Sequence, residues 1–227
     1  MKTLAAWILY LWIALVIVGG LAWAPPLKGF VAGGESSRIV FFHVPMAWTA
    51  FVAFITAGVA SAVYLRTRRP RHDRTAEAAV QLGLLFGALA TLTGSIWARL
   101  EWGTYWNWDP RQGSIVLALL FYAAYLALRS AVEDHETRRR LAAGYAVLGL
   151  VVAPFLFFIA PRLASFSLHP EPVINQRGEV DMDPAILVVL LAGSLGFTAL
   201  FYWLLDLQRR IAARLGREAL GGAGSEA

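Results

Sequence analysis

Six apolar runs alternate with short polar segments along the chain. A helix needs about 20 apolar residues to cross a hydrocarbon layer of about 30 Å, so each run predicts one membrane-spanning helix. The expected spans are 4–23, 46–65, 78–97, 112–129, 141–160 and 185–205. We therefore predict an all-α polytopic membrane protein, a bundle of six transmembrane helices.

Prolines mark several of the expected helix ends. Pro45 suits the first turn of the second span. Asp109-Pro110 and Asp183-Pro184 each place a capping residue before a proline at the first helical position, which predicts the starts of the fourth and sixth spans. Pro154 predicts a kink in the fifth span, and Pro161 predicts its end.

Lys and Arg are distributed unevenly between the loops. Of the 20 lysines and arginines, fourteen lie near the termini or in the segments 66–74 and 129–140, and the other six lie on the opposite side of the expected membrane. Because these residues accumulate in cytoplasmic loops, we predict that both termini are cytoplasmic. The membrane domain is expected to cover 1–208, followed by a basic cytoplasmic tail at 209–227. The expected extracytoplasmic loops are 24–45, 98–111 and 161–184.

Composition supports this class and excludes others. Of the 227 residues, 58% are hydrophobic and 15% are charged, whereas soluble domains contain about 25% charged residues. The net charge of +5 follows from the basic cytoplasmic loops, so we expect no nucleic-acid partner. The chain has no cysteine, which excludes disulfides, thiolate metal sites and covalent haem attachment through Cys-x-x-Cys-His. The first apolar run is too long for a signal-peptide core and predicts a retained helix.

The most distinctive stretch is 102–111, which reads WGTYWNWDPR. Trp and Tyr are enriched at membrane interfaces, so an interfacial belt is the simplest interpretation. The same flat side chains with charged neighbours would also suit a large planar ligand with acidic groups, such as a porphyrin. Trp102, Tyr105 and Trp106 would share one face if the loop were locally helical, and would stack on the ligand. Gly103 would permit close backbone approach.

Charged residues border this stretch. Arg111 and Arg99 are candidates to pair with porphyrin propionates through charge-assisted hydrogen bonds, although an interfacial arginine also meets lipid phosphates. Asp109 is interpreted either as the cap of the fourth span or as a partner for a ligand or an arginine.

Four histidines are present, and two of them are candidate metal ligands. His72 and His135 lie in charged cytoplasmic loops and receive no role. His43 and His169 are expected at span ends on the same face as the aromatic loop, each close to a proline. Neutral imidazole is a standard axial ligand of haem iron. We therefore predict that His43 and His169 bind haem iron from opposite faces.

The stretch 102–111 resembles W-G-x-x-W-x-W-D, the WWD motif of a superfamily of haem-handling membrane proteins. The six-span layout, the short length, His43-Val44-Pro45 and Ser167-Leu168-His169-Pro170 are similar to the cytochrome c maturation protein C family, also called haem exporter protein C. The resemblance covers about 4–205. It implies axial ligation by His43 and His169 and a haem platform formed by Trp102, Gly103, Tyr105, Trp106, Trp108, Asp109 and Arg111.

The resemblance also implies a function. Family members bind haem b without a covalent bond at the outer face of the bacterial cytoplasmic membrane. They pass it to a periplasmic haem chaperone, cytochrome c maturation protein E, for c-type cytochrome biogenesis. They work beside an ABC transporter of A and B subunits and a small D protein. The chain is accordingly expected to transfer haem and not to be an enzyme.

Two alternatives stay open. The first is a subunit of a cytochrome c synthetase of the same superfamily, towards which Asp109-Pro110 followed by Gln112-Gly113 leans; Tyr105 also stands where many family members have tryptophan. The second is a membrane transporter subunit whose Trp-rich loop is only an interfacial belt. That alternative predicts charged residues deep inside the spans, and Asp206 lies only at a span end.

Overall fold

The computed structural model describes residues 2–27, 30–32, 34–170 and 182–223. Within these ranges it contains no strand, and six of its helices are long and apolar enough to cross a membrane. This confirms the predicted all-α membrane bundle. The long helices are α1 (Lys2–Val18), α2 (Val40–Thr67), α3 (Pro70–Trp102), α4 (Pro110–Ala131), α5 (His135–Pro154) and α7 (Pro184–Ala223).

Shorter helical segments extend three of these helices. The segments are η1 (Gly19–Trp23) after α1, η2 (Gly34–Ile39) before α2, and η3 (Phe155–Ile159) with α6 (Ala160–Leu163) after α5. The π-helix η3 directly follows Pro154, where a kink was expected. The expected end at Pro161 is wrong, because the helical backbone continues to Leu163.

Several helices extend well beyond the predicted spans. Pro45 is the sixth residue of α2 and not in its first turn, so His43 is helical. Most of 66–74 belongs to α3, and α7 continues through the expected tail to Ala223. Hydropathy detects only the part of a helix that matches the hydrocarbon layer, whereas backbone hydrogen bonding continues through polar residues whose long side chains reach water.

Both Asp-Pro helix starts are confirmed. The Asp109 carboxylate accepts a hydrogen bond from the Arg111 amide at 3.0 Å, and the Asp183 carboxylate accepts one from the Ala185 amide at 2.8 Å. Lys28 and Arg177, two of the six basic residues assigned to the extracytoplasmic side, lie outside the described residues, as does 171–181 of the third loop.

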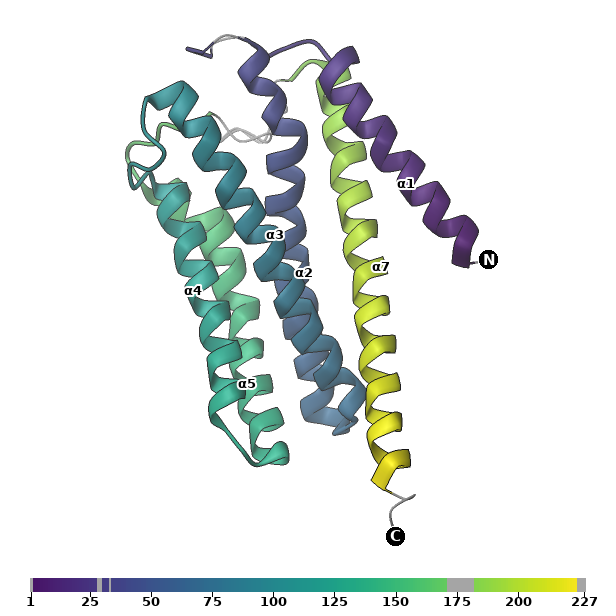
Figure 1. Cartoon of the computed structure of the whole chain (residues 1–227). Coiled ribbons are helices and arrows are strands. Elements are labelled where there is room, and N and C mark those ends of the chain that lie inside the picture. The colour runs from purple at the N-terminus through teal and green to yellow at the C-terminus, as the bar shows by residue number, and fades with distance from the viewer. Residues whose placement is uncertain (1, 28–29, 33, 171–181, 224–227) are drawn as a thin grey trace.

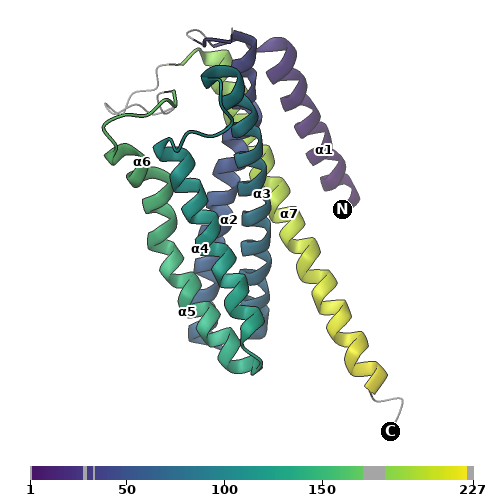
Figure 2. The same ribbon diagram turned by 60° about the vertical axis from the view of Figure 1, so that its left-hand side comes forward.

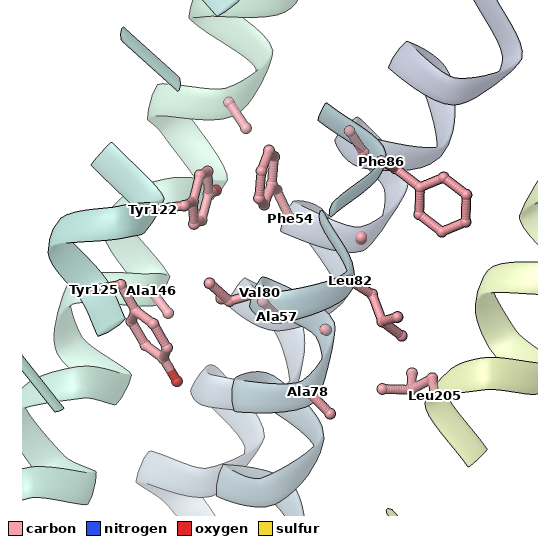
Figure 3. Packing of buried hydrophobic residues seen from close by; sticks show 14 of the residues in the cluster. Phe54, Ala57, Ala78, Val80, Leu82, Phe86, Tyr122, Tyr125, Ala146 and Leu205 are labelled. Carbon is pink, nitrogen blue, oxygen red and sulfur yellow. The ribbon is translucent and has the colours of Figure 1, made fainter. Parts of the chain in front are cut away.

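The core forms where α2 packs between α3, α5 and α7 (Figure 1). Phe54 of α2 stacks on Tyr122 of α4, with ring centroids 3.6 Å apart and planes 2° apart (Figure 3). Gly83 of α3 makes this approach possible, because a Cβ there would lie 2.5 Å from Phe54 Cε1. Small residues at helix contacts are typical of membrane bundles.

The helix α1 diverges from the bundle and packs mainly on α7 (Figures 1 and 2). The Trp12 indole Nε1 donates to the Ala192 carbonyl at 2.9 Å. At the end of α1, Arg38 donates to the carbonyls of Gly20 at 2.8 Å and Ala24 at 2.9 Å. This arginine therefore joins the end of the first span to the start of the second.

A buried ion-pair cluster joins α3 and α4 at the end of the bundle opposite the Trp-rich loop. Arg129 Nη1 lies 2.6 Å from Asp73 Oδ1, and Arg129 Nη2 lies 2.8 Å from Glu77 Oε2. The Arg129 side chain is only 8% exposed. Each charge in this cluster is thus compensated by a partner, as buried charges require.

Candidate functional site

The Trp-rich loop connects the end of α3 to the start of α4 (Figure 2). The helix α3 ends at Trp102, and Gly103 follows with φ 75°. Side chains rarely adopt this left-handed backbone, and a Cβ at Gly103 would meet no described atom within 4 Å. The backbone conformation of the turn therefore favours glycine at this position. The loop is not helical over 103–109, so Trp102, Tyr105 and Trp106 do not share a helical face.

His169 lies against two tryptophans of α3. The ring centroids of Trp102 and His169 are 5.0 Å apart, and those of Trp97 and His169 are 6.2 Å apart. Trp97 also contacts Trp102 edge-to-face at 5.0 Å. Trp97 is buried, and among the described residues its indole N–H has no hydrogen-bond partner. Sequence reasoning missed Trp97, because it lies inside an apolar span and outside the motif.

Asp109 fixes the position of His169. His169 Nδ1 lies 2.6 Å from Asp109 Oδ1, and the Asp109 side chain is 1% exposed. The Ser167 hydroxyl donates to Asp109 Oδ2 at 2.9 Å, and the Leu168 amide donates to the same oxygen at 2.7 Å. Burial acts to raise the pKa of Asp109, but these donors, the Arg111 amide and His169 together hold it below its usual value. The motif aspartate is therefore an ionised acceptor that organises 167–169.

His169 is a neutral imidazole in this arrangement. Burial lowers its pKa from 6.5 to about 4, although the Asp109 carboxylate opposes this shift. A neutral imidazole carries one N–H, and the hydrogen bond to Asp109 places it on Nδ1. The other ring nitrogen, Nε2, consequently keeps its lone pair for a metal.

His43 is held in a comparable way by α3. A Cβ at Gly94 would lie 2.7 Å from His43 Cε1, so the histidine ring packs on the bare backbone of α3. His43 Nδ1 lies 3.3 Å from Thr93 Oγ1. The Thr93 hydroxyl also donates to the Leu89 carbonyl at 2.8 Å, which favours it as the acceptor towards His43. With Nδ1 of His43 as the donor, its Nε2 is unprotonated.

The two histidines contact neighbouring positions on one face of α3. Gly94, beneath His43, and Trp97, beside His169, are three residues apart, so they face the same side with a rise of about 4.5 Å. Arg111 lies close enough to act electrostatically on both rings, and its Nη1 donates to the Pro170 carbonyl at 3.0 Å. The structure thus brings both predicted ligands and Arg111 together beside α3.

The remaining residues of the motif are more accessible. Tyr105 is 61% exposed and Trp108 is 72% exposed. Trp108 contacts Trp106 edge-to-face at 5.6 Å and has φ 60°, a strained backbone for a bulky side chain. Arg99 donates to the Gly103 carbonyl and lies 5.8 Å from the Tyr105 ring centroid. Arg99 therefore caps the end of α3, whereas the two exposed rings are accessible to a ligand or partner.

Glu101 anchors the first loop over the end of α3. Its carboxylate accepts hydrogen bonds from the Val31 amide at 2.7 Å, the Ala32 amide at 3.2 Å and the Ser36 hydroxyl at 2.5 Å. Glu101 is buried, and Phe30 of the same loop contacts Trp97 at 5.9 Å. The loop consequently covers Trp97. Sequence reasoning missed this role because the partners of Glu101 are about 70 residues away.

These groups suit haem better than a bare metal ion. Among the described residues, no three His, Asp or Glu side chains converge in a metal-binding arrangement. Two imidazoles alone would fill only half of the four positions of a protein-bound zinc ion. Haem iron needs only axial ligands from the protein, because the porphyrin supplies the others. The tryptophans and Arg111 match the apolar ring and acidic substituents of a porphyrin.

Comparison with known proteins agrees with this chemistry. A family model described as heme exporter protein C matches residues 1–219. The chain belongs to the heme exporter protein C family. It is 32% identical to heme exporter protein C of Paracoccus denitrificans over 212 residues, covering 90% of the chain and 88% of that relative. Against the protein of the same name from Bradyrhizobium diazoefficiens, identity is 36% over 168 residues, which cover 74% of the chain but 63% of the relative.

A more distant relative points to the same process. The chain is 27% identical over 179 residues to a mitochondrial protein of Marchantia polymorpha whose name assigns it to cytochrome c biosynthesis; the match covers 78% of the chain and 75% of that protein. Family membership and the six candidate spans support a multi-pass membrane protein with a role in haem handling for cytochrome c biogenesis.

Proposed function

We propose that the chain binds haem b non-covalently at the extracytoplasmic end of the bundle, with His43 and His169 as axial ligands, and delivers it to a periplasmic haem chaperone. One observation carries this proposal. His169 donates Nδ1–H to the Asp109 carboxylate, and Nδ1 of His43 contacts the Thr93 hydroxyl beside the same face of α3, an arrangement that directs Nε2 of each ring to a metal. Metal ligation requires an unprotonated ring nitrogen.

The surrounding residues have distinct roles in this proposal. Trp97 and Trp102 form the apolar wall beside His169. The exposed part of the motif extends this wall, and Arg111 pairs with a propionate. Asp109 acts through His169. Bound haem supplies an iron with two axial positions, and the chain itself holds and releases it without a covalent step. The residues of the exposed part are Gly103, Tyr105, Trp106 and Trp108.

The proposal also includes the orientation of the chain in the membrane and the proteins with which it works. The uneven distribution of Lys and Arg supports cytoplasmic termini in the bacterial inner membrane, with the haem site on the periplasmic side. The names of the bacterial relatives support a system for haem export, and the resemblance noted above supplies its other members. These are the ABC transporter subunits A and B, the small D protein and the chaperone, cytochrome c maturation protein E. Because the haem must be released, axial ligation is expected to be weak or dependent on a partner.

The test is the absorption spectrum of the detergent-purified protein before and after addition of haem. The wild type should show a Soret band with six-coordinate low-spin features, which His43→Ala and His169→Ala should each diminish or shift. His135→Ala, at the opposite end of the bundle, is the matched control and should behave like wild type. A wild type without a Soret band after haem addition would refute direct haem binding.

A further inference from the structure

The two candidate ligands are held by acceptors of very different strength. The Nδ1 of His169 contacts a carboxylate at 2.6 Å, and this carboxylate is itself fixed by the Arg111 amide, the Leu168 amide and the Ser167 hydroxyl. The Nδ1 of His43 contacts a neutral hydroxyl at 3.3 Å. The distance and the charge of the acceptor both make the first hydrogen bond the stronger one.

The acceptor at Nδ1 controls how strongly Nε2 binds a metal. An imidazole that shares its Nδ1 proton with a carboxylate carries more negative charge, so it is a more basic ligand and its orientation is fixed. A hydroxyl acceptor gives little of this effect. A more basic axial ligand also favours ferric over ferrous iron, because ferric iron carries the higher charge.

We propose that Asp109 is a positioning residue that makes His169 the stronger axial ligand and leaves His43 as the exchangeable one. This inference rests on the proposed haem site. It changes the role of Asp109 from a part of the haem platform to a group that acts through His169. It also gives release a direction: haem leaves the site by losing His43 first, and a donor atom from the acceptor protein enters on the His43 face.

The first test changes the carboxylate alone. Asp109→Asn keeps a good helix cap but removes the charge opposite His169. Its matched control is Asp183→Asn, the other Asp-Pro helix start, whose carboxylate accepts from the Ala185 amide. Asp109→Asn should weaken ferric haem binding by about 10–100-fold. Each tenfold loss that spares the ferrous form raises the midpoint potential by about 59 mV. Asp183→Asn should change neither quantity.

A readout without haem separates positioning from general damage. In the haem-free protein labelled with ¹⁵N-histidine, NMR should show His169 as the Nδ1–H tautomer with a strongly downfield ring proton. Asp109→Asn should remove that downfield signal while the helical circular dichroism stays at the wild-type level. A downfield proton unchanged in Asp109→Asn would overturn the assignment of Asp109.

The second test needs no change at Asp109. Ferric haem should be held at least tenfold more tightly by His43→Ala, which keeps His169, than by His169→Ala, which keeps His43. In the Asp109→Asn background this difference should disappear. Equal losses in the two single variants, or a difference that persists in that background, would overturn the inference. Wild type that binds no haem would instead refute the proposed function, so the two failures are distinguishable.

Discussion

Gly94→Ala tests whether the His43 ring must lie directly on the backbone of α3. The added Cβ would lie 2.7 Å from His43 Cε1, 3.2 Å from Nδ1 and 3.6 Å from Nε2. Carbon atoms in contact are normally about 3.5–4.0 Å apart. The ring must therefore move away from α3 by about 1 Å, and the bond between Nδ1 and the Thr93 hydroxyl must lengthen or break.

The energies decide what this substitution will affect. Overpacking at a tight contact costs about 1–3 kcal/mol, whereas replacing glycine by alanine inside a helix contributes about 1 kcal/mol of stability. The free energy of unfolding should thus fall by about 2 kcal/mol at most, and the protein should still fold. A ligand displaced by about 1 Å, in contrast, exceeds the tolerance of about 0.5 Å for a positioned site. The substitution should therefore damage ligation more than folding.

The assay combines thermal unfolding of the haem-free protein with the spectrum after haem addition. Gly94→Ala should reproduce the spectral change of His43→Ala, with low-spin features replaced by high-spin ones. Gly144→Ala in α5 is the matched control, because a Cβ there would meet no described atom within 4 Å. Wild-type ligation in Gly94→Ala would show that His43 does not bind from its position on α3, and the argument for its Nε2 would fail.

Three further predictions concern stability and the first loop. Arg129→Met leaves Asp73 and Glu77 without their buried partner and, in thermal unfolding, should lower the free energy of unfolding by about 3–5 kcal/mol. The control Arg68→Ala breaks the exposed pair with Glu136 at 3.3 Å and should lower it by less than about 1 kcal/mol. Glu101→Ala should speed hydrogen exchange at the Val31 and Ala32 amides by about tenfold, the equivalent of about 1.5 kcal/mol, whereas Glu35→Ala should leave both rates unchanged. Burial of His169 lowers its pKa from 6.5 to about 4, so between these pH values the unfolded chain binds a proton that the folded chain does not. The free energy of unfolding of the haem-free protein should therefore fall on acidification through this window, by up to about 1.4 kcal/mol per pH unit. In urea unfolding followed by circular dichroism, His169→Gln should lack this contribution.

Features set by neighbouring residues could be predicted from the sequence. Hydropathy measures transfer into the hydrocarbon layer directly, so the six spans were found. The starts of α4 and α7 were found because a cap and its proline act within one turn, at Asp109 and Asp183. Helix ends at polar residues were placed too early. Their position depends on backbone hydrogen bonding and not on hydropathy, as α3 and α7 show.

Features that arise from packing between distant segments were not predicted. Thr93, Gly94 and Trp97 look like ordinary residues of an apolar helix, and Glu101 looks like an interfacial charge. Their roles appear only when α2, the first loop and 167–170 lie against α3. The positions of the two histidines and the resemblance identified the candidate ligands, but neither contained information about the acceptors that hold their rings.

The arrangement of these acceptors reverses what the backbone alone would indicate. His43 belongs to a long helix, whereas His169 belongs to a loop. A ligand on a helix would ordinarily be the more precisely held of the two. Here, however, the loop histidine is fixed through a buried carboxylate with three further donors, whereas Nδ1 of the helix histidine lies 3.3 Å from a neutral hydroxyl. The side-chain partners of the two histidines, and not their secondary structure, therefore set the order in which the two rings dissociate from the haem iron. Such an inequality gives the transfer of haem an order, because the weaker ligand dissociates first and opens one axial position to an acceptor while the stronger ligand still holds the haem.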